Sequence, residues 1–414
     1  MKLGKFKHRT KCRACNSSDI REVVNLGLMP LAGRFLKREE FESEVAYPLT
    51  LHLCMNCKLL QVINVVYPET LFTDYKYRSS TTETGRTHFK AYAQELFKSH
   101  YLKPSDLVVE VGCNDGVFLK PLCDLGADAI GVDPARNIVK IAKEKGFTVL
   151  NSYFTKKVAL DIIRMKDHKA QMILGSNVFA HIDDMGKVMD AVSVLLTKRG
   201  IFSFEVHYLL DLISKLQYDT IYSEHLCYWS LTALKPFLEK HGLSVFDVKR
   251  VPMHEGSIRV YASQKGNYKV SPRVAQVFDL EHQMKLEEVD TYLHFGQRIE
   301  RHKKLLLRML KMFKNRGKTI VGYGAPGRGN TMLCYCGIDT SVLDYLVDAS
   351  PSRYGYYTPG THIPIYPTEK FREKLPDVAL ILAWSYRTEI LHNEQMFMQK
   401  GGKWIIPLPE PRVI

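Results

Sequence analysis

Two pairs of cysteines near the start of the chain constrain its fold more than any other feature. Cys12 and Cys15 form one C-x-x-C pair, and Cys54 and Cys57 form a second after a long insert. Each turn can direct two thiolates at one ion, and two turns complete the tetrahedron that Zn²⁺ prefers. Because protein ligands would fill all four positions, such an ion stabilises the fold and leaves no position open for chemistry. The spacing therefore predicts a structural zinc site that brings two distant segments into contact.

Two disulfides are the alternative interpretation of the same four cysteines. Disulfides persist mainly in oxidising compartments. The sequence opens with no charged segment followed by a short apolar core, and no run approaches the ~20 apolar residues that a membrane helix needs. We therefore expect a cytoplasmic protein that keeps its thiols reduced, binds zinc and does not enter a membrane.

The region after Pro104 alternates strands with helices. At 414 residues and 45% apolar composition, the chain is long enough for two or three domains. An apolar strand at 107–111 leads through a glycine-bearing turn into a helix, a second strand ends at Asp133, and further strands follow at 170–177 and 200–208. Such a pattern belongs to a doubly wound parallel sheet, in which ligands bind at the carboxyl ends of the strands. Residues expected at those ends are Asn177, His181 and His207.

The turn after the first of these strands distinguishes between two kinds of cofactor. It reads EVGCNDG at 110–116, whereas a dinucleotide site favours G-x-G-x-x-G. Its carboxylates would repel a pyrophosphate but attract the positive charges of S-adenosylmethionine. A carboxylate at the end of the second strand can also accept hydrogen bonds from ribose hydroxyls. The turn therefore favours a methyl donor, and the predicted cofactor-binding residues are Glu110, Gly112, Asn114, Asp115, Gly116, Asp133, Pro134 and Asn177.

A short stretch at 221–229, IYSEHLCYW, sets a carboxylate and an imidazole in an apolar, aromatic run. Charged groups in such surroundings are costly unless they are paired or take part in chemistry. Glu224 and His225 are therefore either a buried pair satisfied by the flanking tyrosines or the acid-base centre of an enzyme. The residues by themselves leave both interpretations open.

Five motifs together resemble the nucleotide-sugar C-methyltransferases, which add a methyl branch to 4-keto-deoxysugar nucleotides. They are the two C-x-x-C pairs, EVGCNDG, SNVFAHIDD, YSEHLCYW and GYGAPGRGNTMLCYCGI, spread in this order over nearly the whole chain. The resemblance implies an α/β protein with three domains. These are an N-terminal zinc-binding domain at 1–75, a central class I methyltransferase Rossmann-like domain at 76–270, and a second Rossmann-like domain at 271–414 that helps to bind the nucleotide sugar.

The resemblance also implies a reaction. A base removes a proton beside the ketone, at the third ring carbon, and the enolate attacks the methyl group of S-adenosylmethionine. His225 is the candidate base, while Glu224 would bind a sugar hydroxyl or orient neighbouring groups. Tyr222 and His181 would donate hydrogen bonds to the enolate oxygen or the sugar.

One more tyrosine completes the set of catalytic residues that the resemblance implies. It lies in the aromatic stretch just after the zinc-binding domain and is either Tyr75 or Tyr77. We favour Tyr77, which precedes two serines. The alternative is that both tyrosines pack at a domain interface with their hydroxyls hydrogen-bonded.

The C-terminal part repeats the strand–turn–helix pattern after a charged, amphipathic stretch at about 275–315. Its turn reads GYGAPGRG at 322–329, and the next strand ends at Asp348. This turn is the best argument for a dehydrogenase, but a proline interrupts the dinucleotide spacing. We instead expect the turn and the following helix N-terminus to bind the diphosphate of the sugar nucleotide. The predicted substrate-binding residues are Arg259, Tyr323, Gly324, Arg328, Asn330 and His362.

The formal charge of +14 implies attraction to an anionic partner. A zinc-containing RNA methyltransferase is one alternative, but it would show a dense basic patch with interleaved aromatic residues, which this sequence lacks. A non-catalytic nucleotide-sugar-binding protein is another, and the presence of both the acidic turn and the YSEHLCYW residues argues against it. We therefore expect a nucleotide sugar as the partner, and no nucleic acid.

Overall fold

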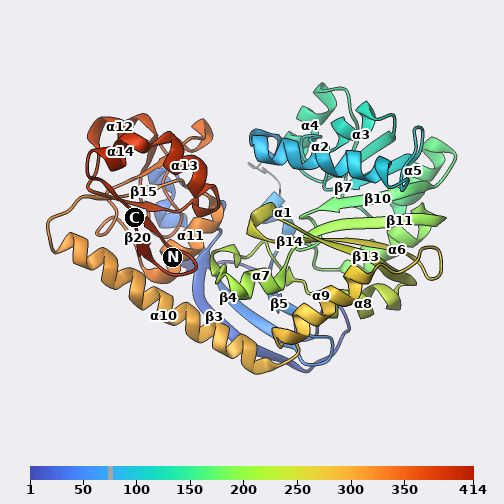
Figure 1. The fold of residues 1–414 in the computed structure, drawn as a ribbon, viewed down its shortest axis with the longest axis horizontal. Coiled ribbons are helices and arrows are strands. Elements are labelled where there is room, and N and C mark those ends of the chain that lie inside the picture. Colours follow the sequence, from blue (N-terminus) through green and yellow to red (C-terminus); the bar gives the residue numbers. More distant parts are fainter. Residues whose placement is uncertain (73–77) are drawn as a thin grey trace.

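A computed structural model describes residues 1–72 and 78–414, which fold into three sheet-based units (Figure 1). The N-terminal strands run between the central unit and the C-terminal unit, and one long helix crosses beneath them. The α/β architecture with a cysteine-rich N-terminal unit and two doubly wound units is confirmed. Tyr75 and Tyr77 lie outside the described residues.

The N-terminal unit is built on an antiparallel sheet. Its strands are β3 (Ile20–Pro30), β4 (Val45–Cys54) and β5 (Leu60–Val62), with β1 (Lys2–Leu3) parallel to β4. A separate ladder joins β2 (Phe6–His8) to β6 (Asn64–Val66), and the short helix α1 (Pro68–Phe72) follows. The fifth strand of the sheet is β12 (Cys227–Tyr228), which comes from the middle of the chain and pairs with β5.

The central unit contains a seven-stranded sheet in the order β13-β14-β11-β10-β7-β8-β9. Five strands are parallel: β7 (Leu107–Val111), β8 (Asp128–Asp133), β9 (Thr148–Asn151), β10 (Ala170–Ser176) and β11 (Leu196–His207). The hairpin of β13 (Leu243–Val251) and β14 (Ser257–Gln264) adds antiparallel strands to β11. The strand order reverses between β7 and β10, and ligands bind at such a switch point.

Helices cover both faces of this sheet because alternate strand residues point to opposite sides. Val108 packs with α2 (Glu83–Lys98), α3 (Leu119–Asp124) and α4 (Arg136–Glu144). Val109 belongs to the core on the other side, which also contains residues of α5 (Lys156–Lys166), α6 (Met185–Leu195) and α8 (Leu231–Lys240). The short helix α7 (Leu209–Ser214) follows β11. Every residue of β7 is therefore buried, as the apolar run predicted.

The C-terminal unit contains a six-stranded sheet in the order β17-β16-β15-β18-β19-β20. Its parallel strands are β15 (Ile320–Tyr323), β16 (Leu346–Asp348), β17 (Ile365–Pro367), β18 (Val378–Ile381) and β19 (Lys403–Ile406). The edge strand β20 (Arg412–Val413) is antiparallel. The helices are α11 (Gly327–Cys336), α12 (Glu369–Lys374), α13 (Arg387–Asn393) and α14 (Gln395–Gln399).

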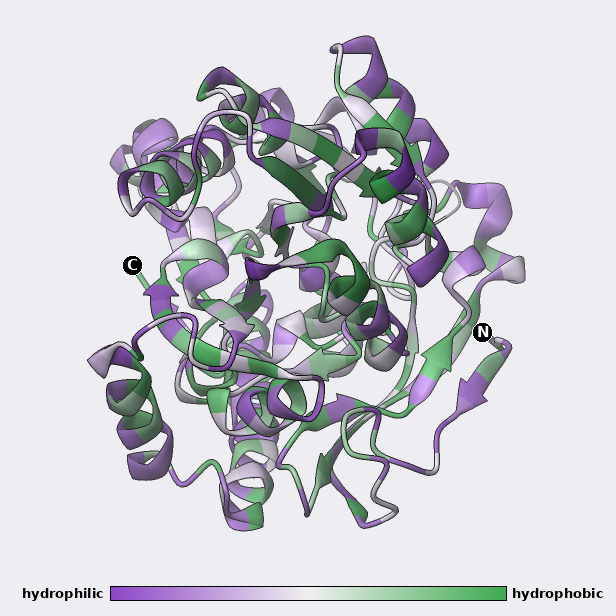
Figure 2. Ribbon diagram, turned by 90° about the vertical axis from the view of Figure 1, so that its right-hand side faces the viewer, coloured by the Kyte–Doolittle hydropathy of each residue, from purple (hydrophilic) through white to green (hydrophobic). Residues whose placement is uncertain are grey.

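The amphipathic stretch predicted between the last two units forms two helices, α9 (Pro272–Gln283) and α10 (Val289–Lys314). The buried side of α10 recurs at helical spacing, and Figure 2 shows hydrophilic and hydrophobic residues alternating along the helices. A Cβ added to Gly296 would lie 3.2 Å from the carbonyl oxygen of Val23, so the helix approaches β3 closely. Helix α10 therefore packs against both the N-terminal sheet, at β3, and the C-terminal unit, at α11 and β15.

We keep the division of the chain at 1–75, 76–270 and 271–414 as a proposal. Strand β14 ends at Gln264 and belongs to the central sheet, which supports a boundary after that residue. Among the helices of the described ranges, none has the length and apolar character to span a membrane.

Candidate active site

The four N-terminal cysteines converge on one point. Their sulfurs all lie within 4.8 Å of one another, with 3.6 Å between Cys12 and Cys57 and 3.5 Å between Cys15 and Cys54. Tetrahedral zinc with ~2.3 Å bonds separates its sulfur ligands by about 3.8 Å. None of the four forms a disulfide. The donor set therefore fits a closed, structural zinc site.

The two cysteine turns share one backbone geometry. Asn16 and Lys58, each next to the second cysteine of its pair, have φ of 64° and 62°. Their amides donate to the carbonyls of Cys12 and Cys54 at 3.0 and 2.9 Å. Each turn thus folds back on its first cysteine and directs both thiols to the same side.

The turn after β7 brings the backbone close to the sheet's switch point. Gly112 has φ of 71°, and a Cβ there would lie 2.8 Å from Val178, so only glycine fits. The amides of Asn114 and Ala135 donate to the two oxygens of Asp133 at 3.0 and 2.9 Å. Asp133 therefore joins the first two strand–helix turns, and each of its oxygens keeps a lone pair for a ribose hydroxyl.

Three buried carboxyl groups, those of Glu110, Asp115 and Asp133, lie at this turn. Glu110 is buried, and its Oε2 has no hydrogen-bond partner among the described residues. Burial raises the pKa of Glu110 well above its usual value, and Asp133 and Asp115 raise it further. Burial also raises the pKa of Asp133. A cationic ligand relieves both penalties, so these residues fit S-adenosylmethionine better than a pyrophosphate.

Two of the predicted cofactor residues hold the turn through their side chains. Asn114 Oδ1 accepts from the amide of Ser79 at 2.9 Å. Asp115 pairs with Lys145 at 3.1 Å and accepts from the hydroxyl of Ser80. These contacts dock the segment after residue 77 onto the cofactor turn. The other oxygen of Asp115, Oδ1, is buried without a hydrogen-bond partner among the described residues, so Asp115 stays a predicted cofactor-binding residue.

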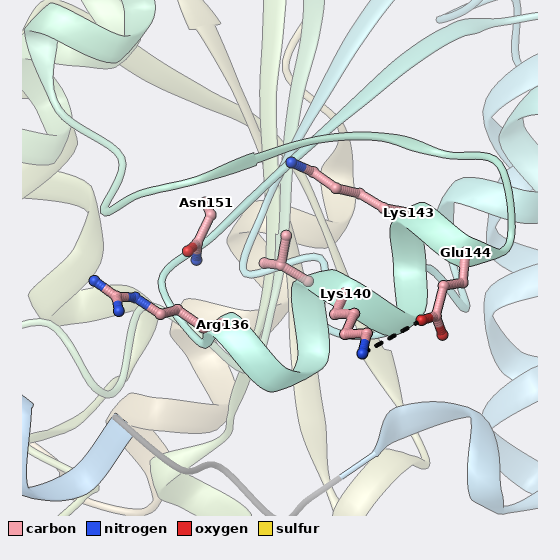
Figure 3. A pocket seen from close by; sticks show the side chains of 6 residues that line it. Arg136, Lys140, Lys143, Glu144 and Asn151 are labelled. Carbon is pink, nitrogen blue, oxygen red and sulfur yellow. Dashed lines mark ion pairs between the residues drawn. The ribbon is translucent and has the colours of Figure 1, made fainter.

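Asn151 supports the far end of the same region. Its Nδ2 donates to the carbonyls of Asp133 and Pro134, both at 3.0 Å. Asn151 also lines a hollow beside α4, whose other labelled residues in Figure 3 are Arg136, Lys140, Lys143 and Glu144. The hollow contains none of the predicted catalytic residues.

His225 is held in one tautomer by its neighbours. Its Nδ1 lies 2.8 Å from the carbonyl oxygen of Thr220, and its Nε2 lies 2.8 Å from the hydroxyl of Tyr222. Because a carbonyl can only accept, the proton is on Nδ1 and the lone pair is on Nε2. Tyr222 therefore donates to Nε2, the nitrogen that can act as a base.

The groups around His225 are kept uncharged. Burial lowers the pKa of His225 well below its usual value, and the His181 ring, 4.9 Å away between centroids, lowers it further. Burial lowers the pKa of His181 to about 4, although its hydrogen bonds with the backbone of Glu224 and Asn177 oppose this shift. Both imidazoles are therefore neutral at pH 7.

Glu224 faces the N-terminal unit. Burial raises the pKa of its carboxyl to about 7. A Cβ added to Gly33, in the loop after β3, would lie only 3.4 Å from Glu224 Oε1.

His207 lies at the end of β11, with its Nε2 2.5 Å from Gln217 Oε1. Burial lowers the pKa of His207 to about 4. The structure thus places Tyr222, Glu224, His225 and His181 in one cluster at the unit boundary.

Helix α11 closes the third side of this cluster. Thr331 Oγ1 donates to the carbonyl of Ile221 at 3.0 Å, and Asn330 Nδ2 donates to the carbonyl of Ala32 at 2.7 Å. Arg328 lies 3.4 Å from Asp219 and 4.7 Å above the Trp384 ring. Its Nη2 is buried without an acceptor among the described residues. The side-chain amide of Asn330 is therefore used in a structural hydrogen bond, whereas Arg328 Nη2 can still donate to a ligand.

Three residues predicted to bind substrate are held elsewhere. Arg259 is buried, with Nε 2.7 Å from Glu205, Nη1 3.0 Å from Glu95, and its guanidinium 3.2 Å above the Tyr92 ring. We therefore remove Arg259 from the phosphate-binding set, because its donors are committed to carboxylates.

Tyr323 and His362 also have internal partners. The Tyr323 hydroxyl donates to Glu394 at 2.7 Å inside the C-terminal core. His362 lies 2.8 Å from Glu44 and stacks on Phe41, so it joins the C-terminal unit to the N-terminal one. Gly324 has φ of 84° and sits against Ala383, where it shapes the turn.

Three family descriptions match successive parts of the chain. A zinc binding domain matches residues 12–72, a methyltransferase domain matches residues 85–248, and the C-methyltransferase C-terminal domain matches residues 252–409. Together they extend over all three units of the structure.

Known proteins resemble the chain to different extents. C-methyltransferase NovU from Streptomyces niveus is 36% identical over 406 residues, which cover 98% of this chain and 96% of that protein. A ubiquinone biosynthesis O-methyltransferase from Bartonella tribocorum is 24% identical over 155 residues, or 34% of this chain and 61% of that protein. The solved structure of magnesium protoporphyrin IX methyltransferase from Synechocystis PCC 6803 with bound SAH is 14% identical, covers 46% of this chain and 90% of its own, and has a TM-score of 0.36. Of these three likenesses, the first extends over nearly the whole chain.

Replacing Cys54 with serine tests the zinc site. We expect bound zinc to fall from about one ion per chain to near zero, and the melting temperature to fall by roughly 5 °C or more, because the ion closes the N-terminal unit. Elemental analysis and thermal unfolding measure both. Cys123→Ser, at an exposed cysteine outside the cluster, is the control. Unchanged zinc and stability in Cys54→Ser contradict the assignment.

Replacing Asp133 with alanine tests the cofactor turn. We expect the affinity for S-adenosylmethionine to fall by ~1.5 to 3 kcal/mol, roughly ten- to a hundredfold, as for charge-assisted hydrogen bonds. Titration calorimetry measures the loss. Asp128→Ala, on the same strand but paired with Lys166, should bind as tightly as the wild type. Equal affinity in the Asp133 variant rules out its role at the ribose.

Proposed function

This chain belongs to the C-methyltransferase family, and from that premise we propose that it methylates a 4-keto-deoxysugar nucleotide at the carbon beside the ketone, the third ring carbon. It is an S-adenosylmethionine-dependent methyltransferase with a zinc-binding N-terminal domain. The observation that carries the proposal is the His225 ring, whose tautomer leaves a lone pair on Nε2 beside a tyrosine hydroxyl. A base next to a hydrogen-bond donor is what proton removal beside a ketone requires.

His225 is the base in the proposed reaction. Its Nε2 takes the proton from the sugar carbon, the C–H electrons form a C=C bond to the ketone carbon, and the C=O π electrons move to the ketone oxygen, which gives the enolate. Burial disfavours the imidazolium that results. The adjacent enolate offsets that cost, because opposite charges attract strongly where water is scarce. The low pKa of His225 therefore keeps its imidazole neutral and able to accept a proton.

Tyr222 changes its partner during this step. Without substrate its hydroxyl donates to Nε2 of His225. When the sugar carbon approaches Nε2, the hydroxyl turns to the ketone oxygen and stabilises the enolate. His181 hydrogen-bonds the sugar, and Glu224 accepts from a sugar hydroxyl. Tyr77, or Tyr75, stays a proposal from the sequence alone.

Bound S-adenosylmethionine supplies an electrophilic methyl group. The residues proposed to hold it follow from the geometry of the turn after β7. Asp133 accepts from the ribose, and the carboxylate of Glu110 compensates positive charge. The backbone around Gly112 allows close approach, and Pro134 and Asn177 flank the site. Asp115 and Gly116 shape the turn.

The N-terminus of α11 is the proposed site of the diphosphate. Arg328 there keeps one buried guanidinium nitrogen without an acceptor. The partial positive charge of a helix N-terminus also favours phosphate. Because Thr331 of the same helix bonds the carbonyl of Ile221, a diphosphate held at α11 presents its sugar to the segment of His225.

The first experiment is to incubate the protein with a panel of 4-keto-6-deoxy nucleotide sugars in heavy water, with and without S-adenosylmethionine. We expect one member to take up deuterium beside the ketone, and to gain one methyl group when the cofactor is added. Mass spectrometry follows both changes. Failure of every sugar to exchange or gain mass, while S-adenosylmethionine still binds, overturns the proposal and directs the search to structured RNA.

Replacing His225 with alanine tests the base. We expect deuterium uptake and methyl transfer to fall by ~10²- to 10⁴-fold, as for loss of a general base. The affinity for S-adenosylmethionine should stay within about twofold in calorimetry, because His225 is not part of the cofactor turn. His168→Ala, on the exposed surface, is the control. Full turnover in His225→Ala removes this residue from the mechanism.

The pKa of about 7 at Glu224 predicts a pH dependence. Burial raises this pKa, so the carboxyl is protonated below pH 7 and ionised above it. Since the carboxylate is the stronger acceptor for a sugar hydroxyl, we expect kcat/KM to rise with pH around 7. Rates at low sugar concentration between pH 5.5 and 9 measure this rise. Glu224→Gln should lack it, and a rise that persists in the variant belongs to another group.

A further inference from the structure

The segment that follows His225 is hydrogen-bonded to the N-terminal sheet. Cys227 and Tyr228 of β12 pair antiparallel with Gln61 and Leu60 of β5. The amide of Val62 donates to the carbonyl of Leu226 at 3.0 Å. The base proposed for the central unit is thus positioned by a sheet of the zinc-binding unit.

Arg13 lies inside this junction. It stands between the zinc ligands Cys12 and Cys15, and its side chain is fully buried. Its Nη1 donates to the carbonyl of Leu226, the residue after His225, and lies 3.9 Å from the sulfur of Cys227. Its Nη2 donates to the carbonyl of Val62 at 2.7 Å. One guanidinium therefore donates hydrogen bonds to the residue directly before β12, next to His225, and to β5.

The same guanidinium reaches the loop that carries His181. Nη2 of Arg13 lies 3.5 Å from Asp183, which also pairs with Arg9 at 2.9 Å. Burial would raise the pKa of Asp183, but Arg13, Arg9 and a lysine lower it further than burial raises it. In addition, the amide of Leu226 donates to the carbonyl of Ala180 at 2.7 Å. The two histidine-bearing segments are therefore joined to each other and to Arg13.

We propose that Arg13 is a positioning residue, which couples the zinc site to the placement of His225 and His181. The inference rests on the proposed function for the roles of these two histidines. The zinc-binding turn fixes the backbone on both sides of Arg13. The Arg13 side chain in turn fixes the positions of Leu226 and Asp183, which belong to the segments of His225 and His181. A guanidinium suits this task because its planar fork donates to several acceptors in fixed directions, whereas a lysine ammonium does not.

Arg13→Met tests the proposal by hydrogen exchange of the protein with its zinc bound. We expect amide exchange of a peptide that covers 222–229 to be at least tenfold faster than in the wild type. A peptide that covers 107–116 in the cofactor turn should exchange at the same rate. Zinc should stay at about one ion per chain, and the S-adenosylmethionine affinity should stay within about twofold. Arg21→Met, an exposed arginine of the same unit, is the matched control.

Kinetics give a second measurement, with the sugar that the exchange panel identifies. We expect Arg13→Met to lower kcat by at least tenfold and to change the KM for the sugar little, because misplacement of the base affects the chemical step. Arg13→Lys, which keeps the charge but loses the fork, should recover only part of kcat. It also replaces the methionine variant in every measurement if that variant does not fold.

Two results overturn the proposal. Unchanged exchange at 222–229 shows that β12 does not depend on Arg13. Loss of zinc, or faster exchange throughout the N-terminal unit, shows that Arg13 serves only the zinc fold. The measurements of amide exchange and zinc content do not require His225 to be the base, since both are made without a sugar. Failure of every sugar in the panel therefore refutes the proposed function, and a fully active His225→Ala variant removes His225 from the mechanism; neither result decides whether Arg13 holds β12.

Discussion

The pairing of β12 with β5 is the interaction on which the candidate active site depends. It fixes the segment of His225 on the N-terminal sheet, whereas His181 follows a strand of the central sheet. Helix α11 of the C-terminal unit closes the cluster through its bond to Ile221. Each unit thus supplies one wall, and the site forms only when all three units are packed together. This requirement explains why buried polar contacts, rather than loose linkers, join them.

The carboxyl groups at the cofactor turn are buried at an electrostatic cost. Burial raises the pKa of the Glu110 and Asp133 carboxyl groups, and one oxygen of Glu110 has no partner among the described residues. Such an arrangement destabilises the folded protein. A cationic ligand converts the same groups into attractive partners, so the cost favours binding. The two histidines of the neighbouring cluster, His181 and His225, are also buried, and burial lowers the pKa of each and keeps it neutral.

The C-terminal unit has the layout of a dinucleotide site but uses its acid differently. Asp348 at the end of β16 accepts from the amides of Ala325 and Ser350, at 2.6 and 2.8 Å, and pairs with Arg353. The Asp348 carboxylate thus accepts three hydrogen bonds from its own unit, which leaves few lone pairs for a ribose hydroxyl. The departure of this turn from the dinucleotide spacing therefore has a structural counterpart, and the N-terminus of α11 stays available at the junction of the units.

The sequence by itself determined the features that depend on residue type and short spacing: four cysteines for zinc, strand–turn–helix units with acids at the strand ends, and the polar group around His225. The tertiary structure decided which charged side chains are available to a ligand. Arg259 meets Glu205 and Glu95 across separations of 54 and 164 residues, and Arg13 meets Leu226 across 213. Spacing along the chain reports periodicity and local turns. The partner of a buried charge depends on how distant segments pack, so only the folded chain shows that Arg259 is paired with carboxylates and that Arg13 reaches the segment next to His225.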